Sequence, residues 1–536
     1  MPIEQQDWWQ DIGSDSLEWA IPEQFNIASA CLDHADPGDT ALITVSGAEI
    51  LTHTYAELRS ESLKLAAWMI DQGLKRGDRV AVLLPQCKEL VLAHMAAYFA
   101  GLIAVPLTVK FGPDAVRFRL QDSGSRMLFL RGTDADRFQP AYTQCPRLDS
   151  LVVSEPDSPP RAGQLPVFSL TDLIDESRKA ADPVPTHRDD PALLIYTSGT
   201  TGNPKGALHA HRVLAAHLPG VRITHEGFPQ PGDRMWSPAE WAWIGGLLDV
   251  LFPSLACGVP VVASAEKFTP GLARRMFEEV GVRNAFIPPT ALKQLRSAGF
   301  ALGSGHPRTV TSGGESLGEN LQDWARDSLG VHVNEFYGQT EMNMVVGQNR
   351  AEWSPANGSM GRAVPGFDVA ILDPMGEPVG PGETGEICLR TPHPGEFLGY
   401  WNQPEKTRSK YFGTFLRTGD LGAQDAEGNI TFKGRADDVI SSGGYRIGPG
   451  EIEETLMSHP SVALAAVVGK PDALRGEVVA AYIVPCDGVA VGEELKTELQ
   501  NHVKHQLAFY QYPRIIEFRS ELPMTPTGKI QRRLLR

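Results

Sequence analysis

The chain has 536 residues and a formal net charge of −16, with 42% hydrophobic and 21% charged residues. This length exceeds one ordinary hydrophobic core, so we expect three or four compact units. The acidic balance disfavours a general surface for nucleic acid or anionic membranes, and we expect no nucleic-acid partner. The six cysteines form no CxxC pair, which indicates reduced thiols. The N-terminus lacks the pattern of a signal peptide, so we predict a cytoplasmic protein.

The first half of the chain alternates helical and strand-like segments. Tyr55–Asp71 has helical spacing, and residues 79–84, 127–130 and 151–153 are predicted to be strands. Such alternation is typical of βαβ units that build a largely parallel sheet covered by helices. A second alternating stretch runs from about residue 233 to residue 341. We therefore expect two such sheets.

Residues 90–109 carry no formal charge and are long enough to suggest a transmembrane helix. Gly101 and Pro106 divide this stretch, and His94 and Tyr98 lie in its first half. A buried helix that ends near Gly101, followed by a strand over residues 103–107, explains the pattern better. We expect no integral membrane segment.

The pattern changes after Pro365. Residues 368–372 and 385–390 are predicted to be strands of a hairpin, which indicates a small antiparallel unit. The sequence GPGETG at 380–385 fits G-x-G-x-x-G, but it leads into a strand and not a helix, so we interpret it as a turn and expect no dinucleotide site. The last hundred residues mix helix and strand, and we place a domain boundary near Asp437, which divides the chain into residues 1–436 and 437–536.

The strongest functional signal is the sequence YTSGTTGNPKG at residues 196–206, which directly follows an apolar run. Its glycines allow close backbone approach to a ligand, its hydroxyl groups donate hydrogen bonds, and Lys205 adds a positive charge. A polyphosphate needs this combination of donors and charge. The spacing is not that of G-x-x-x-x-G-K-[ST], so it does not indicate a P-loop NTPase.

This loop resembles the signature of the adenylate-forming superfamily, which includes acyl-CoA synthetases, peptide-synthetase adenylation domains and luciferases. The resemblance continues in order through GGE at 313–315, YGQTE at 337–341, RTGD at 417–420, a hinge segment at 434–453 and PTGK at 526–529. The hinge sequence is most similar to medium-chain acyl-CoA synthetases and acetyl-CoA synthetase-like enzymes. The implied fold is α/β: a large N-terminal domain of two βαβ-type subdomains plus a small antiparallel β-barrel-like subdomain, then a small mobile α+β C-terminal domain.

The resemblance implies that the chain activates a carboxylic acid with ATP and Mg²⁺ and transfers it to coenzyme A. Thr340 would contact phosphate, and Glu341 would hold Mg²⁺. Asp420 would accept hydrogen bonds from the ribose, Arg435 would support the sugar or phosphates, and Lys529 would stabilise charge at the α-phosphate. The other implied ATP-binding residues are Thr197, Ser198, Gly199, Thr200, Thr201, Gly202, Lys205, Gly313, Gly314, Glu315, Tyr337, Gly338 and Gln339.

The resemblance also implies a C-terminal domain that rotates at Asp437 between adenylation and thioester formation. An ordinary exposed loop aspartate is the alternative at this position. The residues implied for coenzyme A are Gly443, Gly444, Tyr445, Arg446, Arg475 and Lys504. The two glycines would leave room for the pantetheine chain, and the three basic residues would contact the phosphates of coenzyme A. Each of these three residues alone is typical of a solvated surface.

The acyl pocket is expected around Trp241, Trp243 and Gly338. In acetate-specific members of the superfamily a tryptophan closes the pocket at the position of Gly338. Its absence leaves space for several methylenes, each worth about 0.8 kcal/mol when buried. We therefore expect a short- to medium-chain or compact aromatic acid.

Alternative functions stay open at this point. The chain could load an acid onto a carrier protein, although we expect no carrier domain after Arg536. A non-catalytic nucleotide-binding protein is disfavoured by intact Lys205, Glu341, Asp420 and Lys529. Luciferase-like chemistry has no distinct sequence sign. Relatives are often controlled by acylation of the lysine that matches Lys529, so a lysine acyltransferase or deacylase is a further predicted partner.

Overall fold

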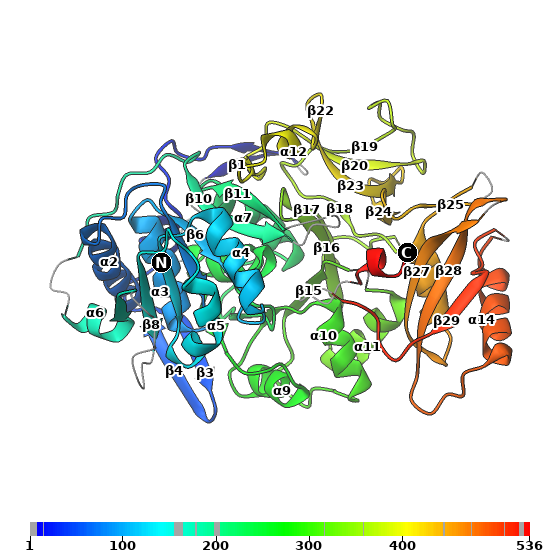
Figure 1. The fold of residues 1–536 in the computed structure, drawn as a ribbon, viewed down its shortest axis with the longest axis horizontal. Coiled ribbons are helices and arrows are strands. Elements are labelled where there is room, and N and C mark those ends of the chain that lie inside the picture. The colour runs from blue at the N-terminus through cyan, green and yellow to red at the C-terminus, as the bar shows by residue number, and fades with distance from the viewer. Residues whose placement is uncertain are drawn as a thin grey trace.

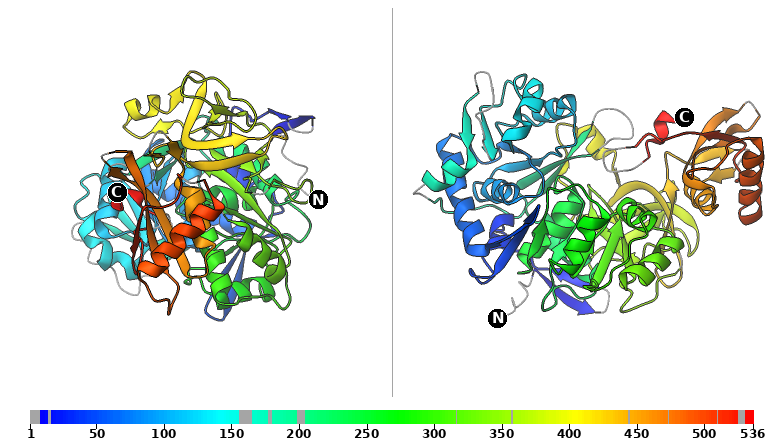
Figure 2. Two further views of the ribbon diagram at one scale, coloured as in Figure 1. Left: turned by 90° about the vertical axis from the view of Figure 1, so that its right-hand side faces the viewer. Right: turned by 90° about the horizontal axis from the view of Figure 1, so that it is seen from below.

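The structure of the protein is a computed structural model. It describes residues 8–13, 16–154, 165–176, 180–197, 204–315, 317–356, 358–442, 445–472, 474–508, 510–524 and 530–536. Two mixed sheets form the body of the molecule, and a smaller antiparallel sheet lies above them in Figure 1. A separate group of C-terminal elements lies at one end of the long axis (Figures 1 and 2).

The first mixed sheet has eight strands, and the strands from β10 to β9 are parallel to their neighbours. In spatial order they are β21 (Gly399–Tyr400), β11 (Lys205–Ala210), β10 (Pro191–Thr197), β6 (Ile103–Pro106), β5 (Arg79–Leu83), β7 (Met127–Arg131), β8 (Ser150–Ser154) and β9 (Val167–Ser169). The helices of this region are α2 (Tyr55–Asp71), α3 (Lys88–Phe99), α4 (Pro113–Ser123), α5 (Ala135–Tyr142) and α6 (Leu170–Glu176).

Local chemistry explains where these helices begin and what they cover. Thr54 and Glu57 form a capping box at the start of α2, with the Thr54 hydroxyl accepting from the Glu57 N–H at 3.2 Å and the Glu57 carboxylate accepting from the Thr54 N–H at 2.7 Å. Every residue of α3 from Leu90 to Phe99 is buried, so this helix lies inside the main hydrophobic core.

The second mixed sheet has nine strands and supplies most of the candidate site. In spatial order they are β18 (Arg362–Ala363), β17 (Asn343–Gly347), β16 (Val333–Gln339), β15 (Thr309–Gly313), β14 (Asn284–Phe286), β12 (Met235–Trp236), β13 (Val261–Ala263), β3 (Thr40–Ser46) and β4 (Glu49–Thr54). Its helical elements are α7 (Val213–Thr224), the π-helical η2 (Gly245–Leu251), α8 (Phe252–Ala256), α9 (Pro270–Glu278), α10 (Pro289–Ser297) and α11 (Glu319–Leu329).

The third sheet is antiparallel and has five strands. These are β19 (Val369–Leu372), β20 (Thr384–Arg390), β23 (Phe415–Gln424), β22 (Tyr411–Phe412) and β24 (Ile430–Arg435), and α12 (Pro404–Arg408) precedes β22. Near the N-terminus, β1 (Trp9–Gly13) pairs with β2 (Ser16–Trp19), and α1 (Ile27–Leu32) follows.

The C-terminal elements build a fourth large sheet with its own core. Its strands are β26 (Tyr445–Ile447), β25 (Ile440–Ser442), β28 (Gly476–Pro485), β27 (Val462–Asp472) and β29 (Ile515–Phe518), with helices α13 (Pro449–Met457) and α14 (Glu493–Gln506). Two single turns of 3-10 helix complete the described elements, η1 (Gly132–Asp134) and η3 (Arg532–Leu534).

This architecture confirms the α/β fold class, the two sheets, the small antiparallel unit and the α+β C-terminal part. Helix α3 followed by β6 confirms the division of residues 90–109, and no helix within the described ranges is long and apolar enough to cross a membrane. The six cysteines are free, as expected. The placement of a domain boundary at Asp437 stays a prediction, although β24 ends at Arg435 and the next sheet begins at Ile440.

The sequence did not predict how distant segments join the second sheet. Strand β3, early in the chain, pairs in parallel with β13, and β16 turns back as an antiparallel hairpin with β17. Local hydrophobic periodicity identifies a strand but not its partners, so pairings between distant segments need information beyond the local pattern.

Candidate active site

Asp420 is the centre of a buried hydrogen-bonded cluster in β23. Its Oδ2 accepts from the Tyr337 hydroxyl at 2.7 Å and from Gln339 Nε2 at 2.6 Å, and its Oδ1 accepts from Arg435 Nη1 at 3.1 Å. Asp420 is only 4% exposed, so these partners compensate the loss of water around the carboxylate. Burial and the neighbouring carboxylate both raise the pKa of Tyr337, which keeps its phenol protonated and able to donate. Four predicted ATP-binding residues thus meet at one carboxylate.

Glu341 lies next to this cluster, just beyond the end of β16. Its Oε1 accepts a hydrogen bond from the Tyr400 hydroxyl, and the Lys205 Nζ lies 5.0 Å from the centre of the Tyr400 ring. The structure therefore brings together the predicted metal ligand and the predicted phosphate-binding lysine through an aromatic residue that the sequence analysis missed. Tyr400 follows Glu341 by 59 positions, so no local spacing could have identified it.

Lys410 is a second residue near this site that the sequence did not indicate. Its Nζ donates to the Thr418 carbonyl at 3.4 Å. Burial lowers the pKa of Lys410, while the charges of Glu341 and Asp420 raise it. The half-buried amine is therefore close enough to both carboxylates for their charges to influence its pKa.

The predicted phosphate loop connects two antiparallel strands of the first sheet. Thr197 ends β10, Lys205 begins β11, and the two residues are cross-strand partners, with the Thr197 hydroxyl 3.4 Å from the Lys205 carbonyl oxygen. The predicted residues Ser198, Gly199, Thr200, Thr201 and Gly202 lie outside the described residues. The two ends of the loop are thus fixed by the sheet.

The predicted adenine-side segment lies at the carboxyl end of β15. Gly313 is in register with Phe336 of the neighbouring parallel strand β16, and a Cβ atom at Gly313 would lie 2.7 Å from the Phe336 ring. Gly314 has a φ of +92°, a conformation that favours glycine, and Glu315 follows half-buried. The GGE and YGQTE motifs therefore share one sheet edge, where open α/β sheets bind their ligands.

Gly338 lies in β16, paired with Met344 of β17 beside a register shift between the two strands, and Thr340 follows the end of β16. A Cβ atom at Gly338 would lie 1.7 Å from the Asn343 carbonyl oxygen, so this backbone excludes any side chain at position 338. Asn343 itself has a φ of +66°. Thr340 is half-buried, and its backbone contacts the ring of His209. Gly338 is therefore required by the close approach of β17, and its effect on the size of the acyl pocket stays a prediction.

The two tryptophans predicted to line the acyl pocket differ in their surroundings. Trp241 is 1% exposed and packs in the main core, whereas Trp243 is half-buried and lies edge-on to Phe111, with ring centres 5.8 Å apart. Trp243 thus keeps an accessible face, and Trp241 is a core residue whose contribution to the pocket stays a prediction.

The residues predicted to bind coenzyme A are dispersed over the C-terminal elements. Tyr445 is 43% exposed and stacks on Tyr510, with ring centres 4.0 Å apart. Arg475 is exposed, and the Lys504 Nζ lies 4.2 Å from the centre of the Tyr512 ring. Gly443, Gly444, Lys529 and the side chain of Arg446 lie outside the described part of the chain.

Asp437, the predicted hinge, is held from two sides. Its Oδ1 accepts from Arg435 Nε at 3.1 Å, and its carbonyl oxygen accepts from Arg536 Nη2 at 2.8 Å. Arg435 therefore contacts both Asp420, the predicted ribose-binding residue, and Asp437, the predicted hinge residue.

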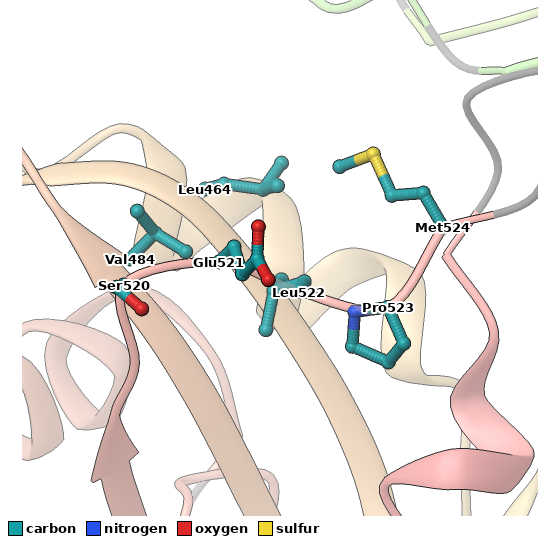
Figure 3. Close-up of a pocket in the computed structure, with 7 residues that line it drawn as sticks. All are labelled: Leu464, Val484, Ser520, Glu521, Leu522, Pro523 and Met524. Atoms are coloured by element: carbon teal, nitrogen blue, oxygen red, sulfur yellow. The ribbon is translucent and has the colours of Figure 1, made fainter.

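A hollow on the C-terminal sheet, shown in Figure 3, contains none of the predicted residues. It is lined by Leu464, Val484, Ser520, Glu521, Leu522, Pro523 and Met524.

A single magnesium ion fits this arrangement. The described residues contain no group of three or more His, Cys, Asp or Glu side chains that could hold a metal. Magnesium does not need such a group, because it binds through one or two carboxylates together with waters and substrate phosphates. Glu341 is a carboxylate of this kind, close to the phosphate loop.

Comparison with known proteins identifies the relatives of the chain. The family "AMP-binding enzyme" matches residues 32–401, and "AMP-binding enzyme C-terminal domain" matches residues 451–529. The human mitochondrial acyl-coenzyme A synthetases ACSM2B and ACSM4 are 35% and 34% identical over 97% and 96% of this chain and over 92% and 91% of their own lengths.

Two solved structures extend the comparison. The anthranilate CoA ligase AuaEII in complex with anthranoyl-AMP matches with a TM-score of 0.85 and 27% identity, over 96% of this chain and 97% of its own. A benzoate CoA ligase from Burkholderia xenovorans LB400 matches with a TM-score of 0.82 and 28% identity, over 96% of this chain and all of its own.

Proposed function

The chain belongs to the AMP-binding enzyme family, and from this premise we propose that it is an AMP-forming acyl-CoA synthetase. The observation that carries the proposal is the buried cluster at Asp420, with Glu341, Tyr400 and Lys205 beside it. The Asp420 carboxylate is positioned to bind a ribose. The Glu341 carboxylate and Lys205 lie next to the predicted phosphate loop.

In the first half-reaction, a carboxylate oxygen of the acid attacks the α-phosphorus of ATP, and pyrophosphate leaves. The two reactants are both anions, so the site must align them and offset their repulsion. We propose that Lys205 and Thr340 hold phosphate oxygens, and that Asp420 accepts hydrogen bonds from the ribose. Magnesium bound through Glu341 would neutralise charge on the departing pyrophosphate.

In the second half-reaction, the thiol sulfur of coenzyme A attacks the acyl carbonyl carbon, and AMP leaves with the oxygen that joined it to the acyl group. We propose that Lys529 serves the first step only, and that rotation at Asp437 then brings the segment around Gly443, Gly444 and Tyr445 to the acyl-adenylate. Asp437 is a reasonable pivot because Arg435 connects it to the nucleotide cluster.

We further propose a short- to medium-chain or compact aromatic acid as substrate. Two structural relatives are an anthranilate CoA ligase and a benzoate CoA ligase, which supports an aromatic acid. The cytoplasmic location stays a proposal, and the human relatives are named as mitochondrial proteins. Acylation of Lys529 by a lysine acyltransferase is also proposed, because it would remove the charge needed for adenylation.

The function is tested by release of AMP and pyrophosphate across a panel of carboxylic acids, with and without coenzyme A. We expect AMP release that depends on both the acid and coenzyme A. Acid-dependent exchange of pyrophosphate into ATP, without coenzyme A-dependent turnover, would instead support loading of a carrier protein. No activity with any acid would support a nucleotide-binding protein without catalysis.

A further inference from the structure

A buried carboxylate–imidazole pair lies beside the candidate active site and has no part in the chemistry above. Asp249 belongs to the π-helical element η2, His217 belongs to α7, and His217 Nε2 lies 2.5 Å from Asp249 Oδ1. The His217 side chain is 1% exposed and the Asp249 side chain 8%. Removing two ionisable groups from water is costly, so such a pair needs either a packing or a functional reason.

A continuous series of contacts connects this pair to the GGE motif. A Cβ atom at Gly313 would touch the Phe336 ring, whose centre lies 5.3 Å from that of Phe286. A Cβ atom at Gly245 would in turn lie 3.1 Å from the Phe286 ring and 3.2 Å from Asp249 Oδ2. Two aromatic rings therefore lie between the nucleotide edge of the sheet and the buried carboxylate.

The pair is also connected to the YGQTE motif from the other side. The ring of His217 is close enough to His209 to influence its charge, and the ring of His209 contacts the backbone of Thr340. Within the described ranges, the Nδ1 of His217 is buried without a hydrogen-bond partner. Asp249 is thus connected by two series of contacts to the GGE and YGQTE motifs.

The second carboxylate oxygen of Asp249 is not used by His217. The Oδ1 atom pairs with His217, and the structure records no hydrogen bond to Oδ2 from any residue that it describes. Gly245, where a Cβ atom would lie 3.2 Å from Oδ2, is half-buried, whereas residues 246–251 of the same element are all buried. The π-helical geometry supports a functional reason, because such segments are rare and occur frequently at functional sites.

We propose that Asp249 is the polar end of the acyl pocket and selects an aromatic acid that carries an amino or hydroxyl group on its ring. The substituent donates a hydrogen bond to Oδ2, while the ring packs against Phe286 and Phe336. His217 is a positioning residue that holds Asp249 through Oδ1. Burial raises the pKa of Asp249 and the charge of His217 opposes this rise, so the imidazole favours the accepting carboxylate. This inference rests on the proposed function.

The test compares acids of nearly equal shape, namely 3- and 4-aminobenzoate, 3- and 4-hydroxybenzoate, and the matching methylbenzoates. A site built to accept a hydrogen bond rejects an analogue without the donor, because its buried oxygen is then left unpaired. We expect a kcat/KM for coenzyme A-dependent AMP release at least about tenfold higher for an amino or hydroxy acid than for its methyl counterpart. The ratio does not depend on the fraction of active enzyme.

Asp249→Leu should reduce this ratio to one or below, and Asp249→Asn, which keeps the shape, should reduce it partly. His217→Gln should also lower the ratio, since the Asp249 carboxylate then loses the imidazole that positions it. The matched control is Asp233→Asn, which alters another buried ion pair, 2.7 Å from Arg308, at the amino end of β12. This control should lower the stability of the fold and leave the ratio unchanged.

The outcomes separate this inference from the proposed function. Equal kcat/KM for the amino, hydroxy and methyl acids would overturn the role of Asp249 while leaving the synthetase activity in place. A ratio that falls equally in Asp233→Asn would also overturn it, because any buried carboxylate would then have the same effect. A panel with turnover only on alkanoic acids would exclude the aromatic class, and no AMP release with any acid would contradict the proposed function itself.

Discussion

The large N-terminal part of the chain and the C-terminal elements prepare their functional residues in opposite ways. Asp420 is 4% exposed and already has three side-chain partners before any ligand is present. Tyr445, in contrast, is 43% exposed, and Lys504 lies on an exposed helix face against Tyr512. The nucleotide site is therefore preorganised around a buried carboxylate, whereas the C-terminal residues predicted to bind coenzyme A lie at the surface.

The largest effect that follows from this contrast is a loss of stability of the N-terminal part at acid pH. Burial lowers the pKa of His94, His209, His211 and His225 to about 3. An unfolded histidine has a pKa near 6.5, so between pH 6.5 and pH 3 the unfolded chain binds more protons and folding stability falls as the pH falls. At pH 5 each such histidine costs on the order of 2 kcal/mol.

Tryptophan fluorescence measures this effect selectively, because all ten tryptophans precede residue 402. We expect a clearly lower Tm at pH 5.0 than at pH 7.5. His94→Gln should reduce the pH dependence by up to one proton, since it removes one of the buried groups. An unchanged Tm at pH 5.0 would mean that the buried imidazoles do not resist protonation.

The next largest effect is expected at the C-terminal lysine. Lys529→Ala removes one positive charge from the α-phosphate, and the loss of a single group that stabilises developing charge typically reduces the rate about 10²- to 10³-fold. We expect this loss in acyl-adenylate formation and not in the thiolation of a supplied acyl-adenylate. Stopped-flow or quench measurements of the two half-reactions separate them.

Lys496→Ala is the matched control for Lys529→Ala, because Lys496 lies on α14 among the C-terminal elements and pairs with Glu493 at the surface. It should leave both half-reactions unchanged. An equal loss of adenylation and thiolation in Lys529→Ala would refute the assignment of Lys529 to the first step.

A smaller effect is expected from Asp420→Asn. The amide keeps the shape of the side chain but leaves Arg435 without its charged partner and weakens the hydrogen bonds to ribose. The expected reduction is about 10- to 100-fold in kcat/KM for ATP, with little change in the KM of the acid. Asp425→Asn, in a turn of the same sheet, is the control, since among the described residues the Asp425 side chain accepts hydrogen bonds from the local turn groups of Glu427 and Asn429.

The smallest effect is expected from Lys504→Ala. An exposed basic residue contributes at most about 1 kcal/mol to binding a phosphate, so the KM for coenzyme A should rise roughly two- to fivefold. The KM for ATP should not change, and Lys496→Ala on the same helix should change neither constant. A large effect of Lys504→Ala on adenylation would contradict the proposal that the N-terminal part binds the nucleotide and that Lys504 contacts coenzyme A.

Local patterns predicted individual elements well and spatial neighbours poorly. Tyr55–Asp71 was predicted as a helix with the observed bounds, because its spacing and the cap formed by Thr54 are both local. The contact of Tyr400 with Glu341 and the pair of His217 with Asp249 join residues 59 and 32 positions apart. No pattern within one element indicates such contacts, since they depend on which strands and helices become neighbours.

The acyl pocket shows the same difference between what a local sequence pattern predicts and what spatial contacts determine. The sequence identified Gly338 as the position that decides pocket size, because the resemblance compares side chains at matching positions. The structure adds that the backbone of Asn343 leaves no space for a side chain there. The reason for glycine is therefore the close approach of β17 to β16, a property that a one-dimensional comparison does not contain.

Transfer of the oxygen of the acid to AMP tests the central claim most directly. In a reaction with an ¹⁸O-labelled carboxylic acid, ATP, magnesium and coenzyme A, one carboxylate oxygen joins the α-phosphorus and leaves with AMP. Mass spectrometry should find one ¹⁸O atom in AMP, none in pyrophosphate, and acyl-CoA equal in amount to AMP. Labelled inorganic phosphate together with ADP, or AMP without label, would show that no acyl-adenylate is formed.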